Sequence, residues 1–259
     1  MGYKKYLPSV FQRIPYRMYD LVTLGLAARK ADAVVVSSEL EYEDAVEFGI
    51  RREKLRIIPM GIDVEEPPPG AAKKEGNSLK ILFLGRLARV RRVELLLRAV
   101  EKLSVPFHVT LVGGEEETSS LAKPGYLNEL KNLCADLGIA SKVTFTGPKP
   151  PGELPMHYNE ADIFVYPSRY ENFAQPILEA AAHGLPIIAT RVGVAREIVR
   201  DGETGFLVPG DPEAIRDRIE RLRDANTRRE MGENISQCVR KKFGWDHVMQ
   251  QYLELYRSL

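Results

Sequence analysis

Short runs of β-branched and aliphatic residues alternate with helical patterns along most of this chain, and this alternation constrains its fold more than any other feature. Six runs read as strands, at residues 79–85, 108–114, 142–147, 162–168, 185–191 and 205–209. Helical patterns separate them; VELLLRAVEKL (93–103) places Val93, Leu96, Leu97, Val100 and Leu103 on one face. Parallel strands need such crossovers and are buried on both faces, so the sequence predicts an α/β fold with a parallel, doubly wound sheet.

The region before residue 63 has the same alternation but is much shorter. DAVVVSS (32–38) and LRIIPMG (55–61) read as strands, and the helix between them begins with a capping box of Ser38 and Glu41 and ends at Gly49. The three prolines and missing apolar face of residues 63–78 are typical of a linker. We expect a partial domain (1–62), a linker (63–78), a complete Rossmann-like domain (79–242) and a C-terminal helix (243–259).

Composition excludes several classes of protein. A net charge of +1 disfavours a nucleic-acid binder, which would be strongly basic. Cys134 and Cys238 lack a CxxC pattern or a nearby histidine cluster, and we interpret them as small buried residues. No apolar run approaches the roughly 20 residues that span a bilayer, and the N-terminus lacks the apolar core of a signal peptide. These features predict a cytoplasmic protein.

Ligands of parallel sheets bind where the strands end, and GRLARVRR (85–92) follows the first strand of the larger domain. Gly85 permits a tight turn close to a ligand. Arg86 and Arg91 lie on either side of the loop, where two guanidinium groups can clamp a diphosphate. The alternative is that Arg91 and its neighbours form the solvated start of a helix.

SRYENFAQPILEAAAHG (168–184) follows the fourth strand of the series and offers a second half of a site. Pro176 suits the first position of a helix, so residues 173–177 would present free backbone N–H groups to a phosphate. Glu179, about one turn inside that helix, could accept hydrogen bonds from two ribose hydroxyls, and Glu171 would face a sugar from the loop. For an isolated pair of glutamates, the alternative is a loop charge and a solvated helix residue.

Two other enzyme classes fit less well. Gly113 and Gly114 form a turn after the second strand, but a GxGxxG fingerprint with its acidic partner is missing, which argues against a dinucleotide-dependent oxidoreductase. A phosphorylase-like enzyme would need a pyridoxal-binding lysine in a matching motif, and none is found.

These segments together resemble a known family. GRLARVRR is similar to the GRL-x-x-x-KG pattern of retaining glycosyltransferases with the GT-B fold, and residues 161–212 resemble that family's PS-x-x-E-G-F-G-x-P-x-LEA segment and the stretch after it. Residues 31–63 resemble the end of its first domain, and FGWDHVMQQYLELY (243–256) its C-terminal helix. The resemblance extends over nearly the whole chain.

The resemblance implies a site for a nucleoside diphosphate sugar, UDP- or GDP-linked, that needs no metal or other cofactor. Glu171 would contact the donor sugar and help organise transfer with retention. The other positions implied to bind the donor are Gly85, Arg86, Arg91, Asn172, Phe173, Ala174 and Glu179, with Pro148 and Lys149 near the base. Arg86 and Arg91 would hold the diphosphate, the amides of Phe173 and Ala174 would bind its oxygens, and Glu179 would bind the ribose.

Four positions depart from the family pattern. Arg91-Arg92 replaces Lys-Gly, which adds bulk in the first loop, and Asn172 and Ala174 replace the two glycines of EGFG. Asn tolerates the left-handed backbone conformation better than Ala does.

Two functions remain open from the sequence. The chain is either a glycosyltransferase acting on a glycan or lipid-linked acceptor, or the donor-binding subunit of a split transferase, in which a separate chain supplies the missing N-terminal half. A degenerate nucleotide-sugar binder belongs to the second class. The histidine that often lies near the transferred sugar has no match among His108, His157, His183 and His247.

The N-terminal stretch YKKYLPSVFQRIPYR mixes basic and aromatic residues. It suits a peripheral contact with the inner face of the membrane. The alternative is that its aromatic residues pack against the partial domain.

Overall fold

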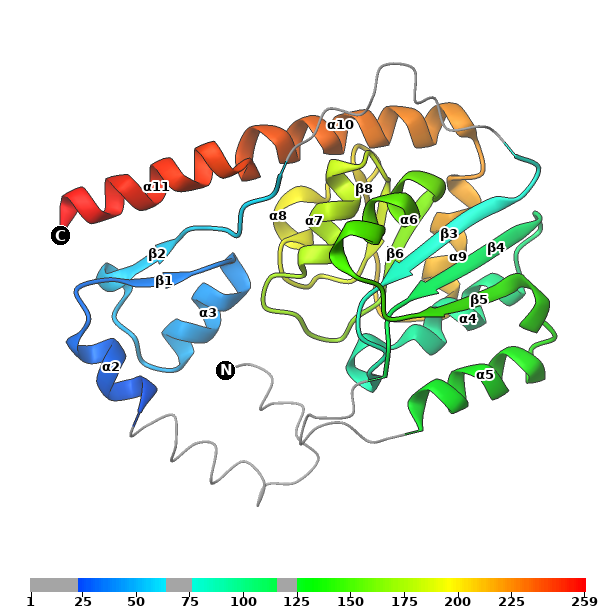
Figure 1. Ribbon diagram of the computed structural model, residues 1–259, viewed down its shortest axis with the longest axis horizontal. Helices are drawn as coiled ribbons and strands as arrows, with labels where there is room; N and C mark the ends of the chain where they lie inside the picture. Colours follow the sequence, from blue (N-terminus) through cyan, green and yellow to red (C-terminus); the bar gives the residue numbers. More distant parts are fainter. Residues whose placement is uncertain (1–22, 64–75, 116–124) are drawn as a thin grey trace.

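The computed structural model describes residues 23–63, 76–115 and 125–259 (Figure 1). The basic and aromatic N-terminal stretch and most of the expected linker lie outside these residues. None of the helices in the described part is long and apolar enough to cross a membrane.

Six parallel strands form the main sheet in the order β5-β4-β3-β6-β7-β8 (Figure 1). The strands are β3 (Leu79–Leu84), β4 (Phe107–Val112), β5 (Val143–Gly147), β6 (Ile163–Tyr166), β7 (Ile187–Ala189) and β8 (Gly205–Leu207). All four residues of β6 are buried, as expected for a central parallel strand. The predicted parallel α/β architecture is confirmed, and the chain order reverses between β3 and β6, the point where such sheets bind ligands.

Helices connect the strands and cover the sheet. They are α4 (Val93–Glu101), α5 (Tyr126–Asp136), α6 (Leu154–Glu160), α7 (Gln175–Ala182), α8 (Ala195–Ile198), α9 (Pro212–Arg221) and α10 (Ala225–Phe243). Four short 3-10 turns are η2 (Arg52–Lys54), η3 (Arg89–Arg91), η4 (Ala140–Lys142) and η5 (Pro151–Glu153). α4 contacts α5 and α9, whereas α7 contacts α10. The predicted apolar face of α4 is buried except at Leu103, which lies beyond the end of the helix and is partly buried.

A small lobe precedes this large lobe. It consists of α2 (Leu24–Lys30), β1 (Val34–Val36), α3 (Glu39–Glu47) and β2 (Leu55–Ile57), with β1 and β2 paired in parallel. Its core is a small cluster of Val36, Ala45 and Leu55. Because so few residues are buried there, the small lobe depends on contacts with the rest of the chain.

The last helix, α11 (Trp245–Ser258), supplies one such contact. α10 ends at Phe243, and the chain continues through Gly244 into α11, which lies over the small lobe (Figure 1). Val248 and Leu255 of α11 pack against Ile58. At the crossing point Ile62 N donates to Phe243 O at 2.9 Å. The two segments that connect the lobes, near Ile62 and Phe243, therefore lie side by side.

The start of α3 differs in detail from the predicted capping box. Ser38 Oγ accepts from Glu41 N at 3.2 Å, as predicted. The Glu41 carboxylate, however, accepts from the backbone and hydroxyl of Ser37, both at 2.7 Å, and the Ser38 hydroxyl also donates to the other lobe. Tertiary contact thus changes a local motif.

The two cysteines are both free thiols. Cys134 is buried, and burial raises its pKa to about 11. Cys238 is only half-buried, so the expectation that both cysteines are buried is wrong for that residue.

Candidate functional site

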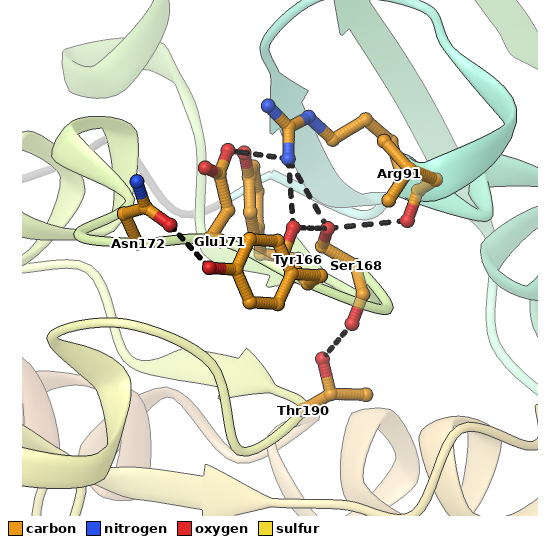
Figure 2. Close-up of polar contacts among 8 residues, drawn as sticks. Arg91, Tyr166, Ser168, Glu171, Asn172 and Thr190 are labelled. Carbon is orange, nitrogen blue, oxygen red and sulfur yellow. Dashed lines mark hydrogen bonds and ion pairs between the residues drawn. The ribbon is translucent and has the colours of Figure 1, made fainter. Parts of the chain in front are cut away.

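The loops that follow β3 and β6 meet at the carboxyl edge of the sheet, with Arg91 between them. This side chain is only 7% exposed. Its Nη1 lies 2.5 Å from Glu171 Oε1 and donates to Ser168 Oγ at 3.3 Å and to Tyr170 O at 3.1 Å. Figure 2 shows the guanidinium pointing at Glu171 with one nitrogen, while its other terminal nitrogen is turned away. Arg91 is therefore not part of a solvated helix start.

Backbone and side-chain hydrogen bonds join the two loops. Arg169 N donates to Val90 O at 2.7 Å, and Arg92 Nε donates to Pro167 O at 3.0 Å. From the next strand, the Thr190 hydroxyl donates to Ser168 O (Figure 2). These bonds hold the segment before Glu171 in one conformation.

Tyr166, the last residue of β6, forms a hydrogen bond with the Glu171 carboxylate. Its hydroxyl donates to Glu171 Oε1 at 2.8 Å. Burial raises the pKa of Tyr166 above its ordinary value, although the charges of Arg91 and Arg86 act in the opposite direction. The phenol therefore stays protonated and acts as a donor, and Arg86, although exposed, lies close enough to influence this site.

Tyr158 of α6 plays the same part for Glu179. Its hydroxyl donates to Glu179 Oε2 at 2.7 Å, and its ring stacks on His183 at a centroid distance of 5.1 Å. Burial raises the pKa of Glu179, and the hydrogen bond from Tyr158 opposes this shift in part. Burial also raises the pKa of the Tyr158 phenol, so it remains a donor.

Neither tyrosine is among the site residues predicted from the sequence. Tyr166 carries a recognisable signal, because a polar group at the end of a buried strand lies at the ligand-binding edge. Tyr158 carries none, because the helix that contains it gives no hint of its contact with α7.

The start of α7 differs slightly from the prediction. The helix begins at Gln175, so Pro176 occupies its second position; both positions lack intrahelical acceptors, and proline is tolerated at either. Ile177 N donates to Ala174 O at 2.9 Å, so the expectation of a free N–H at Ile177 is wrong. The amides that remain for an anion are those of Phe173, Ala174 and Gln175.

Two of the three departures from the family's glycines have a left-handed backbone. Arg92 has φ 51° and Ala174 φ 67°, and within the described ranges they are the non-glycine residues with positive φ. Asn172 is not among them, so its tolerance of that conformation is not used. Such strain is typical of functional loops.

The glycines after β3 and β4 pack against each other. A Cβ on Gly113 would lie 2.0 Å from Gly85 O, so Gly113 serves the contact between two loops and not the approach of a ligand. Gly114 contacts Pro148, which follows β5 at the same edge of the sheet. Lys149 Nζ pairs with Glu153 at 3.1 Å.

The histidines have structural partners or lie away from this edge. His108 in β4 contacts Thr144 Oγ1 at 2.9 Å, and His183 at the end of α7 contacts Asn159 Oδ1 at 2.8 Å. His157 lies in α6 and His247 in α11. Within residues 23–63, 76–115 and 125–259, no three His, Cys, Asp or Glu side chains are grouped to hold a metal ion.

Comparison with known sequences gives consistent results. Residues 68–237 match the family described as glycosyl transferases group 1. The D-inositol 3-phosphate glycosyltransferases of Corynebacterium urealyticum and Acidothermus cellulolyticus are 34% and 33% identical to this chain. Each alignment covers 88% of this chain but only 57% and 53% of the relative, so the chain spans little more than half of their length.

Solved structures with the GT-B fold match as well. Sucrose-phosphate synthase from Thermosynechococcus elongatus has a TM-score of 0.83 and 28% identity, over 99% of this chain and 65% of the synthase. Anabaena HepE, solved with UDP and glucose, has a TM-score of 0.83 and 24% identity, over 94% of this chain and 68% of HepE. The predicted GT-B fold is thereby confirmed.

Proposed function

The chain belongs to the glycosyl transferases group 1, and from that premise we propose that it transfers a sugar from a nucleoside diphosphate sugar to an acceptor hydroxyl, with retention at the anomeric carbon and without a metal ion. The carbon–oxygen bond to the diphosphate breaks, a bond to the acceptor oxygen forms, and the hydroxyl proton leaves with the diphosphate. D-inositol 3-phosphate, named for the curated relatives, is the first acceptor to test.

The observation that carries this proposal is the pair of carboxylates at the start of α7. Each is held by a buried tyrosine hydroxyl, Glu171 by Tyr166 and Glu179 by Tyr158. A glutamate that already accepts one hydrogen bond is oriented and still has an oxygen with which to bind a sugar hydroxyl. In this proposal Glu171 binds the donor sugar and Glu179 the ribose.

The diphosphate would lie between them. Arg91 has N–H groups that its bonds to Glu171, Ser168 and Tyr170 do not use. Arg86, the amides of Phe173, Ala174 and Gln175, and the positive end of the α7 dipole add to the field there. These groups neutralise a departing diphosphate, which is the work that a metal ion performs in other enzymes. Pro148 and Lys149 remain candidates for the nucleotide base.

The exposed apolar residues of the small lobe favour a second candidate function. In it, the chain is a donor-binding subunit that a separate chain completes. Val35 of β1 and Ile57 of β2 are 37% and 39% exposed. Parallel sheets are normally covered on both faces, and a pair of strands is marginal alone. A partner that adds strands and helices would cover these residues and supply an acceptor site.

Calorimetric titration of the purified chain with UDP, GDP, ADP and their glucose conjugates tests the proposal. We expect saturable binding of one nucleotide and of its sugar conjugate. A folded chain that binds none of them would refute the proposed donor site. Transfer to inositol 3-phosphate by the chain alone would favour the complete enzyme over the split one.

A further inference from the structure

Both neighbours of Glu171 are held by the small lobe. The Tyr170 hydroxyl lies 2.7 Å from Asp44 Oδ2, in the last turn of α3. Ser38 Oγ, at the other end of the same helix, donates to Asn172 O at 2.5 Å. Ser38 is completely buried, so the donor of this bond is shielded from water. Both contacts join segments more than a hundred residues apart in sequence.

The two contacts meet at Asn172, whose backbone carbonyl binds Ser38 and whose side chain contacts Tyr170. The Tyr170 hydroxyl also lies 2.5 Å from the Asn172 side-chain amide. A phenol has one hydrogen and cannot donate to both neighbours at once. The two ends of an amide are interchangeable by a half turn, and with its NH₂ toward Tyr170 the amide donates to the phenol, which in turn donates to Asp44. Both contacts of the phenol then pair a donor with an acceptor, and Asp44 sets their direction.

Further contacts between the described parts of the two lobes join α3 to α8. Arg196 of α8 makes two hydrogen bonds to the Glu43 carboxylate, at 2.8 and 2.9 Å, and Glu39 N donates to Glu197 Oε1 at 3.0 Å. They attach α3 to α8. The Asp44 and Ser38 contacts differ because they act on the residues directly before and after Glu171.

We propose that Asp44 and Ser38 of the small lobe are positioning residues that set the Glu171 carboxylate for the donor sugar. Glu179 is held by Tyr158 from within the large lobe and does not depend on them. The nucleotide half of the site is thus intrinsic to the large lobe, whereas the sugar half is complete only when the small lobe is docked. This inference rests on the proposed function, in which Glu171 contacts the sugar.

The test compares Asp44→Leu with Asp44→Asn. Leu has a similar size but no acceptor, whereas Asn keeps an oxygen for the Tyr170 hydroxyl. The measured quantity is the ratio of the affinities for UDP-glucose and UDP, or for the GDP or ADP pair if the wild type binds that nucleotide instead. We expect Asp44→Leu and Tyr170→Phe each to lower this ratio roughly tenfold, the effect of one lost hydrogen bond to a charged group, and Asp44→Asn to stay within about twofold.

The double variant Asp44→Leu/Tyr170→Phe should lose no more than either single variant, because both remove the same interaction. Glu43→Gln, which weakens the exposed contact with Arg196, is the matched control and should leave the ratio unchanged. Equal loss for both ligands in Asp44→Leu, or an unchanged ratio, would overturn the inference.

Hydrogen exchange of the backbone amides of residues 169–173 tests the same inference without a ligand. We expect faster exchange in Asp44→Leu and Tyr170→Phe than in wild type, and wild-type exchange in Asp44→Asn and Glu43→Gln. Unchanged exchange in Asp44→Leu would overturn the inference even if no nucleotide binds. A different outcome would separate the two proposals. If Glu171→Ala weakens UDP-glucose binding but Asp44→Leu leaves the affinity ratio unchanged, the proposed function is supported and only the positioning role is refuted.

Discussion

Glu171 and Glu179 are oriented by the same kind of hydrogen bond, but their charged surroundings differ. Each accepts a hydrogen bond from a buried tyrosine. Glu171, on a loop, also pairs with Arg91 at 2.5 Å. Glu179, in a helix, has no lysine or arginine of the described residues within ion-pair distance, and burial raises its pKa. The tyrosines therefore orient both carboxylates, and the Glu171 carboxylate has a paired cation in addition.

The largest effect is expected from breaking the ion pair on the Glu171 side. Arg91→Ala would leave the largely buried Glu171 carboxylate without its ion-pair partner, and removing one partner of a buried pair costs about 3 kcal/mol of unfolding free energy. Chemical denaturation measures this. Arg51→Ala, which removes an exposed pair with Glu53, is the control and should cost less than about 1 kcal/mol. Similar values for the two variants would show that the Arg91 pair contributes little.

Removing the carboxylate on the Glu179 side is expected to act on ligand binding. If Glu179 binds the ribose, Glu179→Ala should weaken UDP and UDP-glucose alike, by roughly 1.5–3 kcal/mol per lost bond. Titration calorimetry measures both affinities, and Tyr158→Phe should give a smaller loss in the same direction. Unchanged affinity in Glu179→Ala would exclude the ribose role.

The matching change at Glu171 should separate the two ligands. Glu171→Ala is expected to spare UDP and to weaken UDP-glucose by about tenfold, because only the sugar would contact this carboxylate. The same titrations measure it. Equal loss of both ligands would contradict the division of the site into a sugar half and a nucleotide half.

The raised pKa of Glu179 predicts that both stability and ligand binding depend on pH. A carboxyl with a raised pKa in the folded state binds its proton more tightly there than in the unfolded chain, so its contribution to stability falls as pH rises from its ordinary value of 4.5 through the folded pKa. If the Glu179 carboxylate binds the ribose, nucleotide affinity should fall as pH falls through that window.

UDP-glucose is the ligand to use, because its phosphates do not titrate near this window. We expect its affinity to fall severalfold on acidification in the wild type and to change much less in Glu179→Gln. The same pH profile in both proteins would assign the dependence to another group.

The smallest effects concern Arg92 and Ala174, the described non-glycine residues with a left-handed backbone. Ala174→Gly should stabilise the chain by about 1 kcal/mol, because glycine adopts a left-handed conformation without the cost that alanine bears. Arg92→Gly removes the same strain but also the hydrogen bonds to Pro167 O and Ser168 O, and should not stabilise it. Thermal or chemical unfolding measures both, and equal stabilisation would show that the Arg92 bonds contribute nothing.

The sequence by itself determined the elements of this fold. Runs of apolar residues predicted the strands, the apolar face of residues 93–103 predicted α4, and Gly49, with positive φ, ends α3 as expected. The spacing of Glu171 and Glu179 around Pro176 also placed a loop and a helix start correctly. These features depend on contacts within a few residues, which local sequence controls.

Only the tertiary structure decided what each charged side chain touches. Three sets of contacts join residues from different elements. They are the Arg91–Glu171 ion pair, the tyrosine hydrogen bonds to both glutamates, and the contacts of Ser38 and Asp44. No local pattern encodes them, because their geometry follows from how the strands order in the sheet and how α3 docks on the large lobe. A pattern predicts which residues can bind a ligand; packing decides which of them are already bound to each other.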